Sequence, residues 1–303
     1  MRRRLATAAA SAATAAAKLA AQNPKNAIST AQALANSAKI FASANALGLA
    51  ISILSDTHVH LDLIGTGVFA INAIAMAKNQ TNSPTLISAA LISAWSVKLA
   101  GFLFYRALHV KRDARLEETL STSSGAIGFW SISFLWGWLV SLPHTLATAI
   151  PAVSASRGNP FQVGISLFLC IGGLLLETVA DQQKWKFKSN PVNRGQFCDV
   201  GVWQLSQHPN WMGNLMFWTG ILVLNSPRLL TPLGNRVGRF MGACASPLFM
   251  VLLFYGQATG RISPATDLAD RKYGSLPGFQ EYVENTPLII FSPLRFLRWL
   301  MQN

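Results

Sequence analysis

The chain has 303 residues, of which 51% are hydrophobic and only 12% are charged. An ordinary soluble domain carries charge on roughly a quarter of its residues, so the composition argues against a soluble protein and favours a surface that faces lipid. The formal net charge is +13, but the Lys and Arg residues flank apolar stretches, as residues that anchor membrane helices or contact phosphates do. We therefore expect no nucleic-acid binding.

The N-terminal residues 1–55 contain no Asp or Glu, are rich in Ala and Ser, and begin with Arg2, Arg3 and Arg4. This pattern is typical of an organelle transit segment and favours a mitochondrial or plastid membrane, with the endoplasmic reticulum as the alternative. An Ala-rich helix that lies on or enters the membrane would have the same composition. We treat residues 1–55 as an N-terminal extension and residues 56–303 as the membrane domain.

Apolar stretches follow in chain order, and most approach the length of about 20 residues that a transmembrane helix needs. They cover residues 38–54, 59–77, 85–108, 125–150 and 161–180, followed by the shorter 210–225 and 243–256. Helix breaks are predicted at Asn82-Ser83-Pro84, at residues 121–124 and at Arg157-Gly158-Asn159-Pro160. Pro143 predicts a kink within the fourth stretch. The sequence predicts an all-α, polytopic transmembrane bundle of about six to seven helices.

Counting the predicted crossings assigns the loops to membrane faces. Residues 109–124, 181–209 and 257–303 are separated from one another by two spans each, so they should lie on one face. That face holds most of the cations, whereas the opposite loops hold Lys78, Arg157, Arg228, Arg236 and Arg239. By the positive-inside tendency, the cation-rich face should be the cytosolic one or its organellar equivalent. The prediction requires that residues 210–225 cross the membrane.

The segment from residue 181 to residue 214 combines cations with polar and glycine residues. Lys184, Lys186 and Lys188 precede Arg194, and His208-Pro209-Asn210 stands at a predicted helix start. Cations supply charge for a phosphate, glycines let the backbone approach it, and a helix N-terminus offers free N–H groups. The segment is therefore a candidate phosphate-binding site, with a solvated loop next to the membrane as the alternative.

Short motifs in this segment carry a family resemblance. They are Phe187-Lys188, Asn190-Pro191, Asn193-Arg194-Gly195, Gly201-Val202-Trp203 and His208-Pro209-Asn210-Trp211-Met212-Gly213. Upstream, the residues at 62–65, 95–106 and 112–115 stand in the matching order, and Lys272-Tyr273-Gly274 and Thr286-Pro287 follow. Over about residues 56–297 the chain resembles the DUF1295 proteins, relatives of the steroid 5-alpha reductases.

The resemblance implies a bundle of roughly seven transmembrane helices that holds NADPH in a cavity and delivers a hydride to the carbon–carbon double bond of a lipid-soluble enone. The implied contacts to the phosphates come from Arg106, Arg115, Lys188 and Arg194. The implied contacts to the ribose or nicotinamide end come from Asn193, His208 and Asn210, with Asn214 beside them. Tyr105 is the candidate proton donor, and the end of a span is its alternative role.

Departures from the family pattern bear on catalysis more than on fold. Trp211 and Asn214 replace the Tyr and Glu of the usual His-Pro-Asn-Tyr-Phe-Gly-Glu block. An inactive family member that serves as an accessory subunit of an organellar membrane complex is therefore an alternative. A methyltransferase similar to the isoprenylcysteine carboxyl methyltransferases is a further one. S-adenosylmethionine carries no phosphate and Gln207 replaces the arginine of that block, which favours the reductase.

Other polar residues in the apolar part of the chain have simpler interpretations. His58 and His60 stand two positions apart and should point to different sides of a helix, so we expect no metal site. Asp62 should face the interior of the bundle, because a carboxylate in a span is costly. We interpret His144 as a packing residue with its hydrogen bonds satisfied, and Glu177 as a boundary residue or a partner within a cavity.

Overall fold

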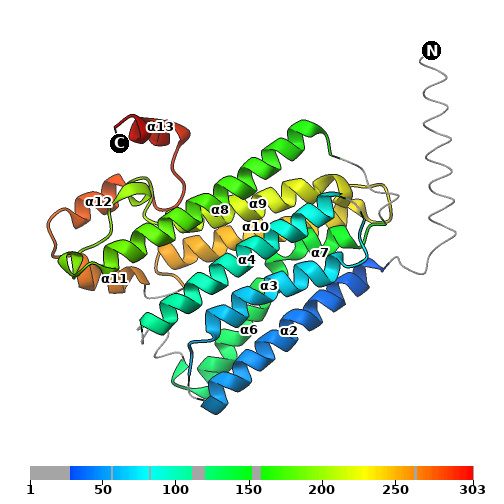
Figure 1. The fold of residues 1–303 in the computed structure, drawn as a ribbon, viewed down its shortest axis with the longest axis horizontal. Helices are drawn as coiled ribbons and strands as arrows, with labels where there is room; N and C mark the ends of the chain where they lie inside the picture. The colour runs from blue at the N-terminus through cyan, green and yellow to red at the C-terminus, as the bar shows by residue number, and fades with distance from the viewer. Residues whose placement is uncertain are drawn as a thin grey trace. The chain divides into compact units, whose positions relative to one another are not determined.

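The computed structural model describes residues 28–55, 57–81, 83–110, 120–151, 158–262 and 265–302. Every regular element within these ranges is a helix (Figure 1). The chain divides into two compact units. Unit 1 comprises Met1–Val163 and Ile221–Ser246, and unit 2 comprises Gly164–Gly220 and Pro247–Asn303. Helices α8, α9 and α10 each contribute residues to both units.

The described part of unit 1 contains five helices of the N-terminal half. They are α2 (Thr30–Ser55), α3 (Leu61–Ala77), α4 (Ser83–His109), α6 (Ser123–Val140) and α7 (Leu142–Thr148). Helix α3 packs along α4, and α2 packs against both α3 and α6 (Figure 1). The unit also holds the last part of α9 (Pro209–Leu229) and the first part of α10 (Arg236–Ala258).

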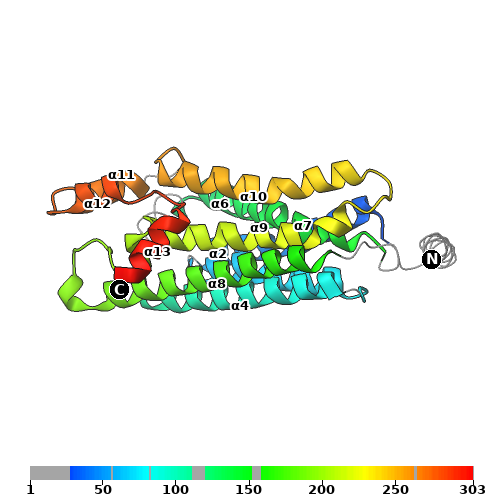
Figure 2. The same ribbon diagram turned by 90° about the horizontal axis from the view of Figure 1, so that it is seen from above.

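Unit 2 contains most of the long helix α8 (Pro160–Ser189), the first part of α9 and the last part of α10. Figure 2 shows α8 and α9 running alongside each other. Short 3-10 helices at Pro191–Asn193 and Gly201–Gln204 interrupt the connection between them. The C-terminal residues form α11 (Ala265–Tyr273), α12 (Phe279–Asn285) and α13 (Pro293–Gln302).

The long apolar helices make the chain an integral membrane protein. Helices α2, α4, α8 and α10 are long and apolar enough to cross a bilayer, and α6 with α7 forms a bent pair that adds a fifth candidate. Helix α3 is apolar but has only 17 residues. The predicted polytopic all-α bundle is confirmed. Four to five helices in the described part of the chain meet the length and hydropathy of a span, because α3 is short and α9 begins with polar residues.

Residues 30–55 of the N-terminal extension are an integral part of unit 1. The Nε1–H of Trp130 on α6 donates to the Ser52 hydroxyl of α2 at 3.0 Å, and a Cβ at Gly48 would lie 2.1 Å from the Trp130 ring. Only glycine lets the indole lie against the α2 backbone. Helix α2 is also long and apolar enough to cross a bilayer, which agrees with the membrane-helix alternative. The transit-segment interpretation stays a prediction for residues 1–27, which lie outside the described residues.

The predicted break points agree with the helix ends. The Thr122 hydroxyl accepts a hydrogen bond from the Gly125 N–H at 3.1 Å and caps α6, and α8 begins at Pro160. Helices α6 and α7 meet at an angle of 54°. The break lies at Ser141, just before Pro143, which stands in the first turn of α7 and lacks the N–H that would continue α6. The predicted kink is confirmed.

His144 lies in a buried polar network of unit 1 and is fully buried. The Ser88 hydroxyl lies 2.9 Å from Nδ1 of His144 and accepts from the Asn225 amide at 3.0 Å, while Nε2 of His144 lies 3.1 Å from the Ala73 carbonyl. Both ring nitrogens of His144 have a partner, as buried polar groups require, whereas Asn225 Oδ1 accepts no hydrogen bond within the described residues. The interpretation of His144 as a satisfied packing residue is confirmed.

Two cations assigned to loops from the sequence are buried in unit 1 instead. The guanidinium of Arg228, in the last turn of α9, donates to the Ala147 and Ile150 carbonyls and to the Gln80 side chain. The guanidinium of Arg239 donates to the Thr231 and Leu233 carbonyls. Their placement in loops is therefore wrong, because Arg228 lies in α9 and Arg239 lies in α10. The free carbonyls at helix and turn ends require donors, and these guanidinium groups supply them.

A close backbone approach joins α8 and α9 in unit 2. A Cβ at Gly173 would lie 2.4 Å from the Gly213 carbonyl oxygen, and a Cβ at Gly213 would lie 2.5 Å from the Gly173 carbonyl oxygen. These glycines let the two helices touch along their main chains. Small residues at a helix crossing are the usual means of packing helices tightly in membranes. The contact fixes which side chains of α8 meet which side chains of α9.

Candidate functional site

Two polar pairs follow the glycine contact between α8 and α9. Glu177 and Asp181 stand four residues apart on α8, and Asn210 and Asn214 stand four residues apart on α9, so each set lies on one helix face. The Asn214 amide donates to Glu177 Oε1 at 2.9 Å, and the Asn210 amide donates to Asp181 Oδ1 at 3.3 Å. We call Glu177–Asn214 and Asp181–Asn210 the polar pairs. Their order shows that α8 and α9 run antiparallel.

The asparagine oxygens of the polar pairs offer acceptors to a ligand. Glu177 is 3% exposed and Asn214 is 7% exposed. Both Asn210 Oδ1 and Asn214 Oδ1 are buried and accept no hydrogen bond within the described residues. A buried amide oxygen that accepts no hydrogen bond is less stable than the same oxygen hydrogen-bonded to water. These atoms are therefore suited to a hydroxyl or carboxamide donor of a bound molecule.

An aromatic stack begins at the first turn of α9. The His208 and Trp211 rings lie parallel with centroids 4.0 Å apart, and Trp211 stacks on Phe254 of α10 at 5.0 Å. Burial, together with the charge of Lys184, lowers the pKa of His208 to about 3. His208 is therefore neutral at physiological pH. Trp211, a departure from the family pattern in sequence, is a member of this stack.

The neutral His208 predicts acid lability. The imidazole in the unfolded chain takes up a proton as pH falls below about 6.5, whereas the folded chain does so only near pH 3. The free energy of unfolding should therefore decrease between these values, by about 2 kcal/mol at pH 5. Thermal unfolding in detergent at pH 7 and pH 5 measures the change. His208→Phe keeps an aromatic ring but cannot titrate, so its unfolding temperature should fall less; an equal fall in both proteins would contradict the assignment.

Lys188 lies where the cationic segment meets the C-terminal part of unit 2. Its ammonium donates to the Gln196 carbonyl and, at 3.0 Å, to the Tyr273 hydroxyl. Burial alone would raise the pKa of Tyr273, but the hydrogen bonds and charges of Lys188 and Lys272 outweigh burial and lower it. Lys184 lies over the Trp203 ring at 4.2 Å. Several cations therefore converge here.

Asn193 and Arg194 occupy the turn after α8. The Asn193 amide donates to the Phe187 carbonyl at 3.1 Å and caps the C-terminal end of α8. Arg194 is exposed and precedes Gly195, whose positive φ of 86° forms the turn. Asn193 thus has a structural role in addition to the predicted ribose contact, which stays a prediction. Arg194 is accessible to a phosphate.

Two of the three predicted cationic segments lie together. The Tyr282 hydroxyl of α12 donates to the Trp203 carbonyl at 2.9 Å. The Gln207 amide donates to the Val283 and Thr286 carbonyls, and the Gln207 N–H donates to the Pro287 carbonyl at 2.9 Å. Residues 181–209 and the C-terminal residues are therefore in direct contact in unit 2. Gln207, which replaces an arginine in the methyltransferase block, ties them together.

The predicted site residues Tyr105 and Arg106 belong to unit 1. The Arg106 guanidinium lies 3.9 Å from the Asp62 carboxylate, and the two side chains are 38% and 43% exposed, respectively. The prediction that Asp62 faces the bundle interior is therefore wrong: its carboxylate lies in the first turn of α3, where the N–H groups and Arg106 stabilise it. Tyr105 is 49% exposed and its ring lies 4.2 Å from the His109 ring. Arg115 lies outside the described residues.

Sequence reasoning missed several residues that build the site. Gln183 Oε1 accepts from the Val202 N–H at 2.9 Å and lies against Gly201, which has a φ of 56°. The pairing of Glu177 with Asn214 was also not predicted. A signal existed in the matching four-residue spacings on α8 and α9, but the sequence does not give the register of the two helices.

Comparison with known proteins identifies the family. A family model described as a protein of unknown function, DUF1295, matches residues 48–286. The chain belongs to the DUF1295 family. The matched DUF1295 residues begin within α2, include the polar pairs and the aromatic stack, and end just after α12. No curated protein and no solved structure matches the chain.

Proposed function

We propose that the chain is a membrane-embedded, NADPH-dependent reductase that acts on the carbon–carbon double bond of a hydrophobic enone, steroid-like or fatty. The observation that carries the proposal is the combination in unit 2 of converging cations with buried asparagine oxygens that accept no hydrogen bond. The resemblance to the steroid 5-alpha reductases supports the same function.

The residues of unit 2 fit the chemistry of NADPH. The diphosphate and the 2′-phosphate of the nucleotide need cationic partners, because burying an unpaired polyanion costs several kcal/mol. Lys188 and Arg194 are the proposed phosphate contacts, with Lys184 and Lys272 near them. Asn210 and Asn214 would accept hydrogen bonds from a ribose hydroxyl or the carboxamide. NADPH, when bound, supplies the hydride that is added to one carbon of the double bond.

The protein must also supply a proton to complete the reduction. Addition of a hydride to the β-carbon of an enone leaves an enolate, which a proton converts to the saturated ketone. An acid near the carbonyl oxygen is therefore required. Tyr105 remains the proposed donor, although its ring lies half exposed beside His109. Tyr105→Phe should lower turnover without changing NADPH affinity if this assignment holds.

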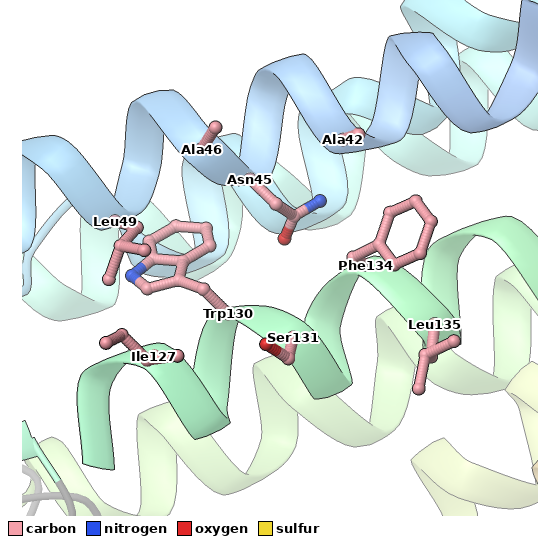
Figure 3. Close-up of a pocket in the computed structure, with 9 residues that line it drawn as sticks. All are labelled: Ala42, Asn45, Ala46, Leu49, Ile127, Trp130, Ser131, Phe134 and Leu135. Atoms are coloured by element: carbon pink, nitrogen blue, oxygen red, sulfur yellow. The ribbon is translucent and has the colours of Figure 1, made fainter. Parts of the chain in front are cut away.

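A groove in unit 1 supports a lipid-soluble substrate. It has a volume of about 380 Å³ and lies between α2 and α6 (Figure 3). Its lining is apolar except for the side chains of Asn45 and Ser131. The other lining residues are Ala42, Ala46, Leu49, Ile127, Trp130, Phe134 and Leu135. Asn45 Oδ1 is buried and accepts no hydrogen bond within the described residues, while Figure 3 shows the Asn45 amide directed from α2 towards α6. A hydrophobic molecule with a hydroxyl group matches this lining.

Filling the groove should weaken substrate binding selectively. Ala46 is exposed on the wall of the groove, and a phenyl ring at this position would occupy the space between α2 and α6. We expect Ala46→Phe to raise KM at least about tenfold, which corresponds to the loss of about 1.4 kcal/mol of binding. The dissociation constant for NADPH should stay unchanged. An unchanged KM would remove the groove from the substrate path. Leu47→Phe, at an exposed position of α2 outside the lining, is the matched control.

Purification of the full chain in mild detergent tests the proposed function. Binding of NADPH is measured by nucleotide fluorescence, and oxidation of NADPH is followed with a panel of steroid and fatty enones. Saturable NADPH binding with enone-dependent oxidation supports the reductase. Binding of S-adenosylmethionine without NADPH binding would instead support the methyltransferase-like alternative. Absence of both, with stable co-purifying subunits, would support the accessory-subunit alternative.

One observation favours the accessory-subunit alternative. Asn214 stands where the family usually has Glu, and its amide is hydrogen-bonded to the buried Glu177. This pair stabilises the contact of α8 with α9 without a reacting molecule. A chain that had lost catalysis could retain the fold through this contact. The NADPH-binding measurement distinguishes the two proposals.

A further inference from the structure

The C-terminal helix α13 lies beyond the residues matched by the family and has a strongly two-sided composition. Its sequence, Pro293–Gln302, contains two arginines and no acidic residue. Arg295, Arg298 and Gln302 share one side of the helix at a spacing of three and four residues. The opposite side is formed by Leu294, Leu297, Leu300 and Met301, which are 57%, 53%, 58% and 79% exposed.

Helix α13 is attached to unit 2 through its polar side. The Arg295 guanidinium donates to the Asn285 and Gln204 carbonyls at 3.0 and 2.9 Å, and the Trp299 indole donates to the Gln204 side chain at 2.9 Å. The Ser292 hydroxyl caps the helix by accepting from the Arg295 N–H at 3.2 Å. The helix is therefore held in place while its apolar side remains uncovered.

The attachment point marks the end of a membrane span. Gln204 follows Trp203, whose indole donates to the Ala180 carbonyl of α8 at 2.9 Å. The mostly apolar part of α8 ends at Ala180, and a segment with Asp181 and three lysines follows. The change from apolar to charged residues along α8 is typical of the boundary between the bilayer and water, and Trp203, 3% exposed, is packed in the core beside it. Helix α13 is attached at that boundary.

A groove of about 640 Å³ lies beside α13 and combines cations with apolar side chains. It is lined by Gln204, Leu205, Pro287, Ile290, Ser292, Leu294, Arg295, Arg298 and Trp299. Arg295 is held by carbonyl oxygens, whereas Arg298 is exposed. The groove thus offers a guanidinium beside an indole and aliphatic side chains, which matches the boundary between a lipid phosphate and its acyl chains.

We propose that α13 lies in the plane of the bilayer surface and that the groove beside it binds the headgroup of an acidic lipid. The exposed leucines and Met301 enter the acyl region, and Arg298 pairs with the headgroup phosphate. Basic amphipathic helices bind membranes in this way, and acidic lipids add about 1 kcal/mol per cation near the surface.

Site-specific labelling of the full chain in lipid nanodiscs tests the proposal. An environment-sensitive dye is attached to Met301→Cys and, as the control, to Val192→Cys, which is 85% exposed in the turn after α8. The unsubstituted chain, in which Cys170 and Cys198 are buried and Cys244 is partly exposed, gives the background, and Cys244→Ser is introduced into every labelled variant. Quenching by iodide in the water and by spin-labelled lipid acyl chains is measured in neutral nanodiscs and in nanodiscs with 30% phosphatidylglycerol.

We expect iodide to quench the dye at residue 301 about threefold less than the dye at residue 192, with the opposite order for the lipid quencher. Acidic lipid should increase this difference in quenching between the two positions. Arg298→Glu should abolish the increase, whereas the control Lys78→Glu should leave it unchanged. Equal iodide quenching at both positions would overturn the bilayer placement. Lack of response to acidic lipid would overturn the headgroup assignment. Protection that appears only with two chains per nanodisc would assign the apolar side to a second copy and overturn the proposal.

Discussion

Reversal of two charges, Lys188→Glu with Arg194→Glu, is expected to abolish NADPH binding while leaving the chain folded. Each residue lies on the surface of unit 2, so the cost in stability is about 1 kcal/mol or less. Each lost contact between a cation and a phosphate removes about 1.5 to 3 kcal/mol, and the new carboxylates repel the nucleotide. The dissociation constant should rise at least about a hundredfold, as measured by NADPH fluorescence in detergent.

Controls separate the charge effect from the local contacts of Lys188. Tyr273→Phe removes the hydroxyl that Lys188 contacts at 3.0 Å without changing any cation, so NADPH affinity should stay the same. Lys78→Glu with Arg236→Glu makes the same change in net charge at exposed positions of unit 1. Unchanged NADPH affinity in the Lys188 and Arg194 double variant would remove the phosphate assignment.

Asn214→Glu, which restores the usual family residue, should strongly destabilise the protein. The Asn214 amide donates to Glu177 Oε1, and both side chains are buried. A carboxylate in its place removes the donor and brings two acidic groups into contact. Breaking a buried polar pair and leaving uncompensated charge costs about 3 kcal/mol or more. Thermal unfolding in detergent should show a clear fall in midpoint relative to the natural chain.

A swapped variant tests whether the pair itself is responsible. Glu177→Gln with Asn214→Glu again places one carboxylate beside one amide, so it should recover most of the lost stability. NADPH oxidation by the swapped variant also tests whether the site accepts an acidic residue on α9. If Asn214→Glu alone is as stable as the natural chain, the hydrogen bond to Glu177 has no energetic importance and the proposed structural role of Asn214 fails.

The elements of the fold could be predicted largely from local sequence signals. Apolar stretches and the capping and helix-breaking residues between them predict the helix boundaries to within a few residues, as at Ser83-Pro84, Thr122, Pro143 and Pro160. These signals work because capping and the missing proline N–H act locally. The burial of Arg228 could not be predicted. Its environment depends on the carbonyls of α7 and on Gln80, which are far away in sequence.

The candidate site could be predicted in part. Lys188, His208 and Asn210 lie in unit 2 among the cations and aromatic rings that the cationic segment suggested. The partners of these residues could not be predicted, since Glu177, Asp181 and Phe254 reach the site only through packing of α8, α9 and α10. Helix propensity and periodicity give the faces of single helices but not the register between two of them.

The contact between Gly173 and Gly213 has a consequence for how the family can vary. Insertion of one residue between Gly173 and Glu177 would turn the rest of α8 by about 100° and carry Glu177 away from Asn214. Point substitutions of the asparagines keep this alignment, whereas length changes in either helix abolish it. Homologous chains should therefore exchange the polar side chains as matched pairs and preserve the spacing from each glycine to its neighbouring polar residue.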